Sequence, residues 1–290
     1  MSYLDTLDNE LALAGIPRRR RSRILTEFAD HLDESPSAEL GEPGLLAQQF
    51  ADELGTRLAR TSAYRAFALL ALAGVLLAVL FFSGGRTWGG WVGYGYYRIT
   101  AYLPGWWVPY MIVCFVTAQI ALAAGSLAFL RAWRLRHQPV MTTADAVIIN
   151  RRAALALVCG AFTMTLVPAT HFVVGPTPSL AIRPAITVAV CALIVALLAA
   201  LPAVLAAGRL RPRREGKAGD LVADLGTHDA RVTPWRVALA LSLAILVVAT
   251  LLGVRTDDTY DGILRGVSDA GACMIGFIAL GRYLGLRTAS

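Results

Sequence analysis

The chain has 290 residues, of which 56% are hydrophobic and only 16% are charged. Soluble globular domains usually carry about 25% charged residues, so this composition excludes an ordinary soluble protein of this size. The formal net charge of +7 excludes a strongly acidic chain. We predict an all-α, polytopic membrane protein.

Residues 66–85 form the first predicted span, and the rest of the chain is organised around it. They read AFALLALAGVLLAVLFFSGG, without one charge. Twenty residues at about 1.5 Å per residue reach roughly the 30 Å of bilayer hydrocarbon. Similar apolar segments follow, which predicts a bundle of about six spans. The predicted spans are residues 66–85, 107–130, 153–174, 184–207, 235–254 and 263–284.

The segment before the first span is polar, and we expect it to form a small three-helix cytoplasmic module. Gly15 and Pro17 end the first helix and start the second, and the third begins near Pro43. No apolar signal-peptide core is present, so the N-terminus is expected to stay in the cytoplasm. We therefore divide the chain into a module at residues 1–60 and a transmembrane domain at residues 61–290. No strong breaker separates the third helix from the first span, which leaves one continuous helix open.

Three stretches of the module carry a family resemblance: the Tyr-Leu-Asp opening, RSRILTEFADHLDE at residues 21–34, and LGEPGLLAQQFADELG at residues 40–55. Over roughly residues 2–60 the chain resembles the bacterial HAAS signalling domain, which occurs ahead of transmembrane helices and is often associated with PadR-type transcription regulators. The resemblance implies that the module binds a PadR-like regulator. This chain has four successive arginines where the family usually has a mixed-charge second helix. Our candidate partner contacts are Arg18, Arg19, Asp30, His31 and Phe50.

Motifs for catalysis are absent from the sequence. No GxxxxGK[ST] loop, HExxH pair or Cys-x-x-Cys spacing occurs, and the four histidines are scattered. We therefore predict a protein that is not an enzyme, with no catalytic residues, cofactor or metal site.

Polar residues within the predicted spans are the remaining candidates for function. Gln119 lies near the middle of the second span and is expected to donate a hydrogen bond to another helix. His171 lies near the far end of the third span and is expected to be a solvated or hydrogen-bonded interfacial side chain. Arg265 and Asp269 are four residues apart and are expected to pair, with a ligand or proton site as the alternative. Small residues of the second span, including Ala121 and Gly125, predict a helix-packing face.

The distribution of basic residues predicts the orientation of the chain in the membrane. We place both termini and the connectors 131–152 and 208–236 in the cytoplasm, which leaves five of the twenty-seven basic residues outside. Those five are Arg86, Arg98, Arg183, Arg255 and Arg265. The expected location is the bacterial plasma membrane. The basic loops are expected to attract anionic lipids, no direct contact with nucleic acid is expected, and oligomerisation stays open.

Two functions fit these features. The preferred one is a membrane regulatory protein whose module binds a cytoplasmic transcription regulator. The alternative is a permease-like or transporter accessory subunit for a small solute. A neighbouring transcription-regulator gene favours the first, whereas an adjacent ATPase gene or substrate-dependent flux favours the second.

Overall fold

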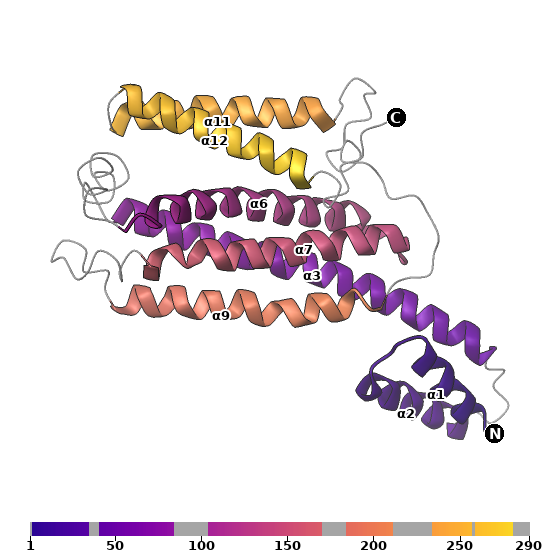
Figure 1. The fold of residues 1–290 in the computed structure, drawn as a ribbon. Helices are drawn as coiled ribbons and strands as arrows, with labels where there is room; N and C mark the ends of the chain where they lie inside the picture. Colours follow the sequence, from indigo (N-terminus) through magenta and orange to yellow (C-terminus); the bar gives the residue numbers. More distant parts are fainter. Residues whose placement is uncertain are drawn as a thin grey trace.

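The computed structural model describes residues 2–34, 41–83, 104–169, 184–210, 234–256 and 259–280, and within them the chain is helical without a strand (Figure 1). Four of the helices are long and apolar enough to cross a membrane. An all-helical protein with several candidate spans is therefore confirmed. The full set of six spans stays a prediction.

Helix α1 (Tyr3–Leu13) shows how local sequence sets the ends of a helix. Ser2 and Asp5 form a capping box, in which the Ser2 hydroxyl accepts from the Asp5 N–H and the Asp5 carboxylate accepts from the Ser2 N–H. At the other end Gly15 has a φ of +80°, and the next N–H, that of Ile16, donates to the Leu11 carbonyl. This is a Schellman motif, which glycine favours because it has no Cβ. The predicted stop at Gly15 and Pro17 is confirmed.

Helices α1, α2 (Arg18–Glu34) and the start of α3 (Pro43–Ser83) lie together at one end of the molecule (Figure 1). The Tyr3 hydroxyl donates to the Gly41 carbonyl over 2.7 Å, which ties α1 to the beginning of α3. The cluster of apolar side chains buried here also includes a residue that follows a distant helix, Leu210. Its buried members are Leu7, Leu11, Ile16, Ala47, Ala51 and Leu210.

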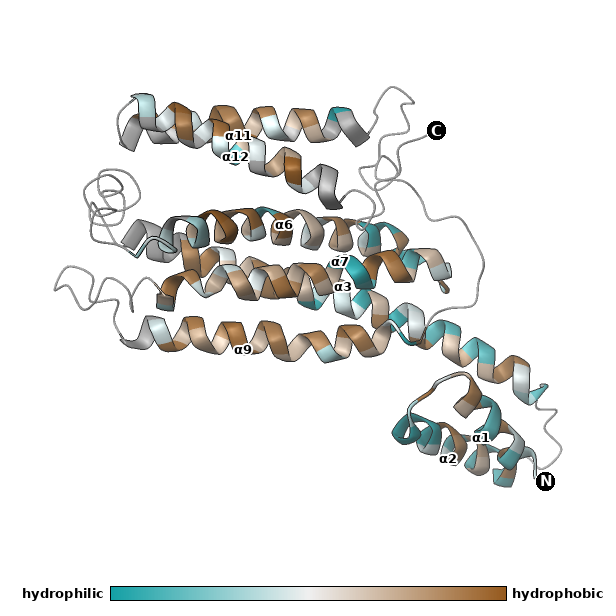
Figure 2. Cartoon of the chain, viewed as in Figure 1, coloured by the Kyte–Doolittle hydropathy of each residue, from teal (hydrophilic) through white to brown (hydrophobic). Residues whose placement is uncertain are grey.

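Helix α3 joins this cluster to the apolar bundle without interruption. It has 41 residues, so it is about 60 Å long, roughly twice the thickness of bilayer hydrocarbon. Gly55 lies buried within it. The predicted third helix and first span are therefore one helix, of which the N-terminal part is polar and the C-terminal part apolar (Figure 2).

Helices α3, α6 (Trp107–Arg134), α7 (Thr143–Met164) and α9 (Pro184–Ala207) form a four-helix bundle whose surfaces are mostly hydrophobic (Figure 2). Leu70 of α3 lies between Gly125 of α6 and Gly160 of α7. A Cβ on either glycine would lie 2.5 Å from a methyl group of Leu70, so the three helices approach closely only because both positions lack a side chain. Ala121 and Ala124 are buried on the same α6 face, which confirms the predicted packing face.

The remaining helices, α11 (Pro234–Thr256) and α12 (Thr259–Leu280), pack against each other, and α12 also contacts α6 (Figure 1). A Cβ on Gly266 would lie 2.0 Å from the Thr250 hydroxyl oxygen and 2.9 Å from the Leu246 carbonyl oxygen. The two helices are therefore in close backbone contact at this point. The predicted fifth and sixth segments are helical, and whether they cross a membrane stays a prediction.

Candidate functional site

The predicted partner contacts on α2 lie at its two ends. Arg18 and Arg19 are exposed in the first turn, and Asp30 and His31 are exposed in the last. Twelve residues of helix separate the two pairs, or about 18 Å. Phe50 of α3 is half-buried and packs edge-on against Phe28, with ring centroids 6.1 Å apart. The structure therefore does not bring the five residues into one patch.

The first of these ends borders a groove between α1 and α2 with a volume of about 380 Å³. Both apolar and polar side chains line it. The lining residues are Leu4, Asp8, Arg18, Arg21, Ser22, Leu25, Thr26 and Ala29.

Arg21 of α2 links the two helices that form the groove by binding Asp8 of α1. Its Nη1 lies 3.2 Å from the Asp8 carboxylate and also donates to the Asp8 carbonyl oxygen over 3.2 Å. Of the four successive arginines, Arg21 is thus bound to α1. Arg18 is exposed, lines the groove and makes no ion pair with the described residues.

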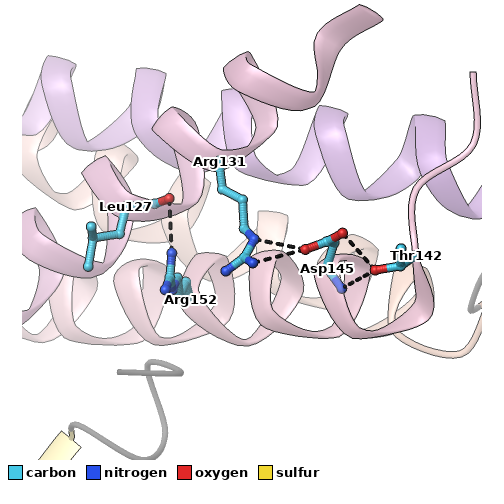
Figure 3. Close-up of polar contacts among 5 residues, drawn as sticks. All are labelled: Leu127, Arg131, Thr142, Asp145 and Arg152. Atoms are coloured by element: carbon cyan, nitrogen blue, oxygen red, sulfur yellow. Dashed lines mark hydrogen bonds and ion pairs between the residues drawn. The ribbon is translucent and has the colours of Figure 1, made fainter. Parts of the chain in front are cut away.

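A second polar site lies where the C-terminal end of α6 and the N-terminal end of α7 meet (Figure 3). Arg131 of α6 binds the Asp145 carboxylate of α7, with Nη2 at 2.9 Å and Nε at 3.1 Å from Oδ1. The side chains are 3% and 9% exposed. The other carboxylate oxygen accepts from the Thr142 hydroxyl over 2.6 Å, and that hydroxyl caps α7 by accepting from the Asp145 N–H.

Arg152 lies two turns further along α7 and is fully buried. Its Nη1 donates to the Leu127 carbonyl of α6 over 3.2 Å (Figure 3). Two helices of a bundle are therefore joined by guanidinium groups inside their interface, where an unpaired charge is costly.

These residues correct one expectation. The arginines of residues 131–152 were expected in a basic connector, but α6 continues to Arg134 and α7 begins at Thr143. Arg131 and Arg152 are helical and buried, whereas Arg151 is exposed. The burial of these two arginines could not be predicted from their sequence, because their charges are compensated by groups of another helix rather than by water.

Helix α3 is fastened to the short connection between α6 and α7. The Thr56 hydroxyl accepts from the Met141 N–H over 2.9 Å, and the residue is 1% exposed. Arg60 Nη2 donates to the Leu135 carbonyl over 2.6 Å and to the Gln138 carbonyl, and a cation is favourable at this C-terminal end of α6. Four residues separate Thr56 from Arg60, so both act from one face of α3.

We call this set of contacts the junction. It consists of Thr56, Arg60, Arg131, Met141, Thr142, Asp145 and Arg152. It fixes the middle of α3 to α6 and α7, while the N-terminal part of α3 continues outward to α1 and α2.

The predicted intramembrane residues have different outcomes. Gln119 Nε2 lies 3.5 Å from the Asp269 carbonyl oxygen of α12, a contact of the kind expected for an interhelical donor. The Asp269 side chain is half-buried. His171 and the Arg265 side chain lie outside the described residues, and the Arg265–Asp269 pair stays a prediction.

No family model, curated protein or solved structure matches this chain. The HAAS resemblance of residues 2–60 therefore stays a prediction from short motifs. The sequence contains no motif that singles out Leu210 or the Arg131–Asp145 pair as contact residues.

Proposed function

We propose that this chain is a non-enzymatic regulatory protein of the bacterial plasma membrane, multi-pass with both termini in the cytoplasm, whose N-terminal module binds a cytoplasmic protein. The observation that carries the proposal is the continuity of α3. One helix belongs both to the module and to the bundle, so a change in the bundle reaches the module without crossing a flexible linker.

The junction supports this use of α3. Thr56 and Arg60 attach α3 to the α6–α7 connection, and the α3 residues before them contact α1. A movement of α6 and α7 therefore acts on α3 at the C-terminal end of the module. The partner we propose is a PadR-like transcription regulator, and this identification depends on the HAAS resemblance alone.

The alternative is a permease-like or transporter accessory subunit. Such a protein needs a route for solute between helices. The close approach of α3, α6 and α7 around Leu70 supports the regulatory proposal, because three helices in van der Waals contact leave no route between them.

Deletion of residues 1–53 tests the proposal, because it removes α1, α2 and the start of α3 but keeps Thr56 and Arg60 of the junction. We expect normal membrane insertion and changed transcript levels of neighbouring genes. The matched control is Leu13→Ala in the full chain, since this side chain is 76% exposed. Unchanged transcripts together with solute-dependent flux in vesicles would favour the permease-like alternative.

Orientation is tested separately. Reporter fusions after Tyr94 and after Lys217 are expected to lie on opposite sides of the membrane, with the second in the cytoplasm. Reporters on the same side would contradict the proposed topology.

A further inference from the structure

Helix α2 begins with positively charged residues, which interact unfavourably with the helix dipole. Its first four residues are all arginine, and its first turn contains no acidic residue. The N-terminal end of a helix carries a partial positive charge, so cations there are unfavourable and anions are favourable. Neighbouring like charges add further repulsion. Local rules of this kind are most often broken where a protein binds something.

The described part of the chain compensates this charge only in part. Arg21 is paired with Asp8, and Arg23 is paired with Glu27 over 2.9 Å. Arg18, Arg19 and Arg20 are exposed and form no ion pair with described residues. Three guanidinium groups are therefore exposed in the first turn of α2, and one of them, that of Arg18, also lines the α1/α2 groove.

The groove adds an apolar element to this cationic end. Leu4 of α1 and Leu25 and Ala29 of α2 line it, with Arg18 at one end. A volume of about 380 Å³ accommodates one or two side chains rather than a whole helix. The groove thus fits a segment that inserts an apolar anchor and places carboxylates at the arginines.

We propose that the α1/α2 groove docks an acidic amphipathic helix of the protein partner. An apolar side chain of that helix packs on Leu4, Leu25 and Ala29, and an acidic residue beside it pairs with Arg18. Helix-in-groove recognition uses anchors of this kind at spacings of three and four residues. This inference depends on the proposed function, because it names the chemistry of the partner that the module binds.

A protein partner fits the module better than an anionic membrane surface. Residues 1–60 contain eleven acidic residues against seven basic ones, so the module as a whole is repelled by anionic lipid headgroups. The favourable charge is confined to one end of α2, which adjoins the groove lined by both apolar and polar side chains.

The test uses the full-length protein in nanodiscs of zwitterionic lipid. The probe is a fluorescent 18-residue peptide with leucine at helical i, i+3, i+4 and i+7 spacing and glutamate at most other positions. Binding is measured by fluorescence anisotropy. A peptide with lysine in place of glutamate and a scrambled peptide of the same composition are the control probes. We expect saturable binding of the acidic helix alone, weakened by added salt.

Two variants locate the site. Arg18→Glu reverses the charge at the groove mouth, and Ala29→Trp fills the groove. We expect each to weaken binding by about tenfold or more. Arg57→Glu is the matched control, because Arg57 is exposed on α3 and outside the groove, and it is expected to leave affinity within about twofold. Unchanged thermal unfolding in detergent verifies that the variants are folded.

Three outcomes would overturn the inference. The first is no binding of the acidic peptide, and the second is equal loss of binding in the Arg18 and Arg57 variants. The third is loss of peptide binding when the nanodiscs contain phosphatidylglycerol, which would assign the arginines to the lipid surface. The proposed function is judged separately: changed transcripts on deletion of residues 1–53 but not in Arg18→Glu would keep the function and reject this groove.

Discussion

The module, formed by α1, α2 and the start of α3, and the junction are both rich in polar residues, but they are stabilised in different ways. The helix ends of the module are set by contacts close in sequence, such as the Ser2–Asp5 capping box and the turn at Gly15, although its buried cluster also includes the distant Leu210. The junction is held by contacts between distant residues, such as Thr56 with Met141, and by charges removed from water.

This difference predicts unequal sensitivity to substitution. A helix cap contributes about 1 kcal/mol, whereas breaking a buried ion pair costs about 3 to 5 kcal/mol because the remaining charge stays buried. Loss of the buried ion pair of the junction should therefore have the largest effect and loss of a helix cap of the module the smallest, with a buried apolar contact and a buried hydrogen bond between them. The four predictions below test this order, from the largest expected effect to the smallest.

Arg131→Met should have the largest effect. It leaves the buried Asp145 carboxylate without its guanidinium partner, and we expect the free energy of unfolding in mixed micelles to fall by about 3 to 5 kcal/mol. Arg131→Met combined with Asp145→Leu should recover most of this loss. Arg151→Met is the control, because Arg151 is exposed on α7. A single variant as stable as the control would show that the pair contributes nothing.

Leu210→Ala tests the contact between the bundle and the module. Leu210 is 5% exposed and packs with Leu7, Leu11 and Ile16 of the module. Its truncation should lower the stability of α1 by about 2 to 3 kcal/mol, measured as faster amide hydrogen exchange in α1. Leu205→Ala is the control, because that side chain is 56% exposed. Equal exchange in both variants would mean that α1 is stable without Leu210.

Thr56→Val removes one hydrogen-bond acceptor from the junction while keeping the shape of the side chain. The buried Met141 N–H then has no acceptor, at a cost of about 1 to 2 kcal/mol. Thr61→Val is the comparison, since the Thr61 hydroxyl donates only to the Arg57 carbonyl of its own helix. Chemical denaturation should separate the two variants. Equal midpoints would place the Met141 N–H in contact with water.

Ser2→Ala should have the smallest effect, about 1 kcal/mol or less, because it removes one exposed cap. The Ser2 hydroxyl and backbone N–H hold the pKa of Asp5 below its ordinary value. A carboxyl with a lowered pKa in the folded state stabilises above its unfolded pKa, and that stabilisation is lost as pH falls through the folded pKa. Helicity of α1 should therefore decrease on acidification below about pH 4, and the decrease should be smaller in Ser2→Ala. An identical acid transition in both proteins would contradict this assignment.

Much of the fold could be predicted because its causes are local. Gly15, Pro17 and Pro43 mark helix ends by their backbone chemistry, and apolar runs long enough to cross a bilayer mark α3, α6, α7 and α9. The contact of Gln119 with the Asp269 carbonyl of α12 has a similar cause, since a polar side chain in an apolar helix needs a partner.

The junction and the Leu210 contact could not be predicted because they depend on tertiary structure. Arg131 and Arg152 have the same sequence context as exposed arginines such as Arg151, and only the arrangement of α6 against α7 distinguishes them. Leu210 follows the end of α9 like any residue of a loop. Its burial depends on where α9 ends relative to α1.

The position of Leu210 also bears on the order in which the protein is completed during synthesis. The other buried members of the module cluster, Leu7 to Ala51, are all made early, whereas Leu210 follows Ala51 by about 160 residues. At a synthesis rate of about 5 to 20 residues per second, the ribosome takes roughly 8 to 30 s to close that gap. The module therefore leaves the ribosome first, but the set of side chains that forms its buried cluster is complete only after α9 has been made.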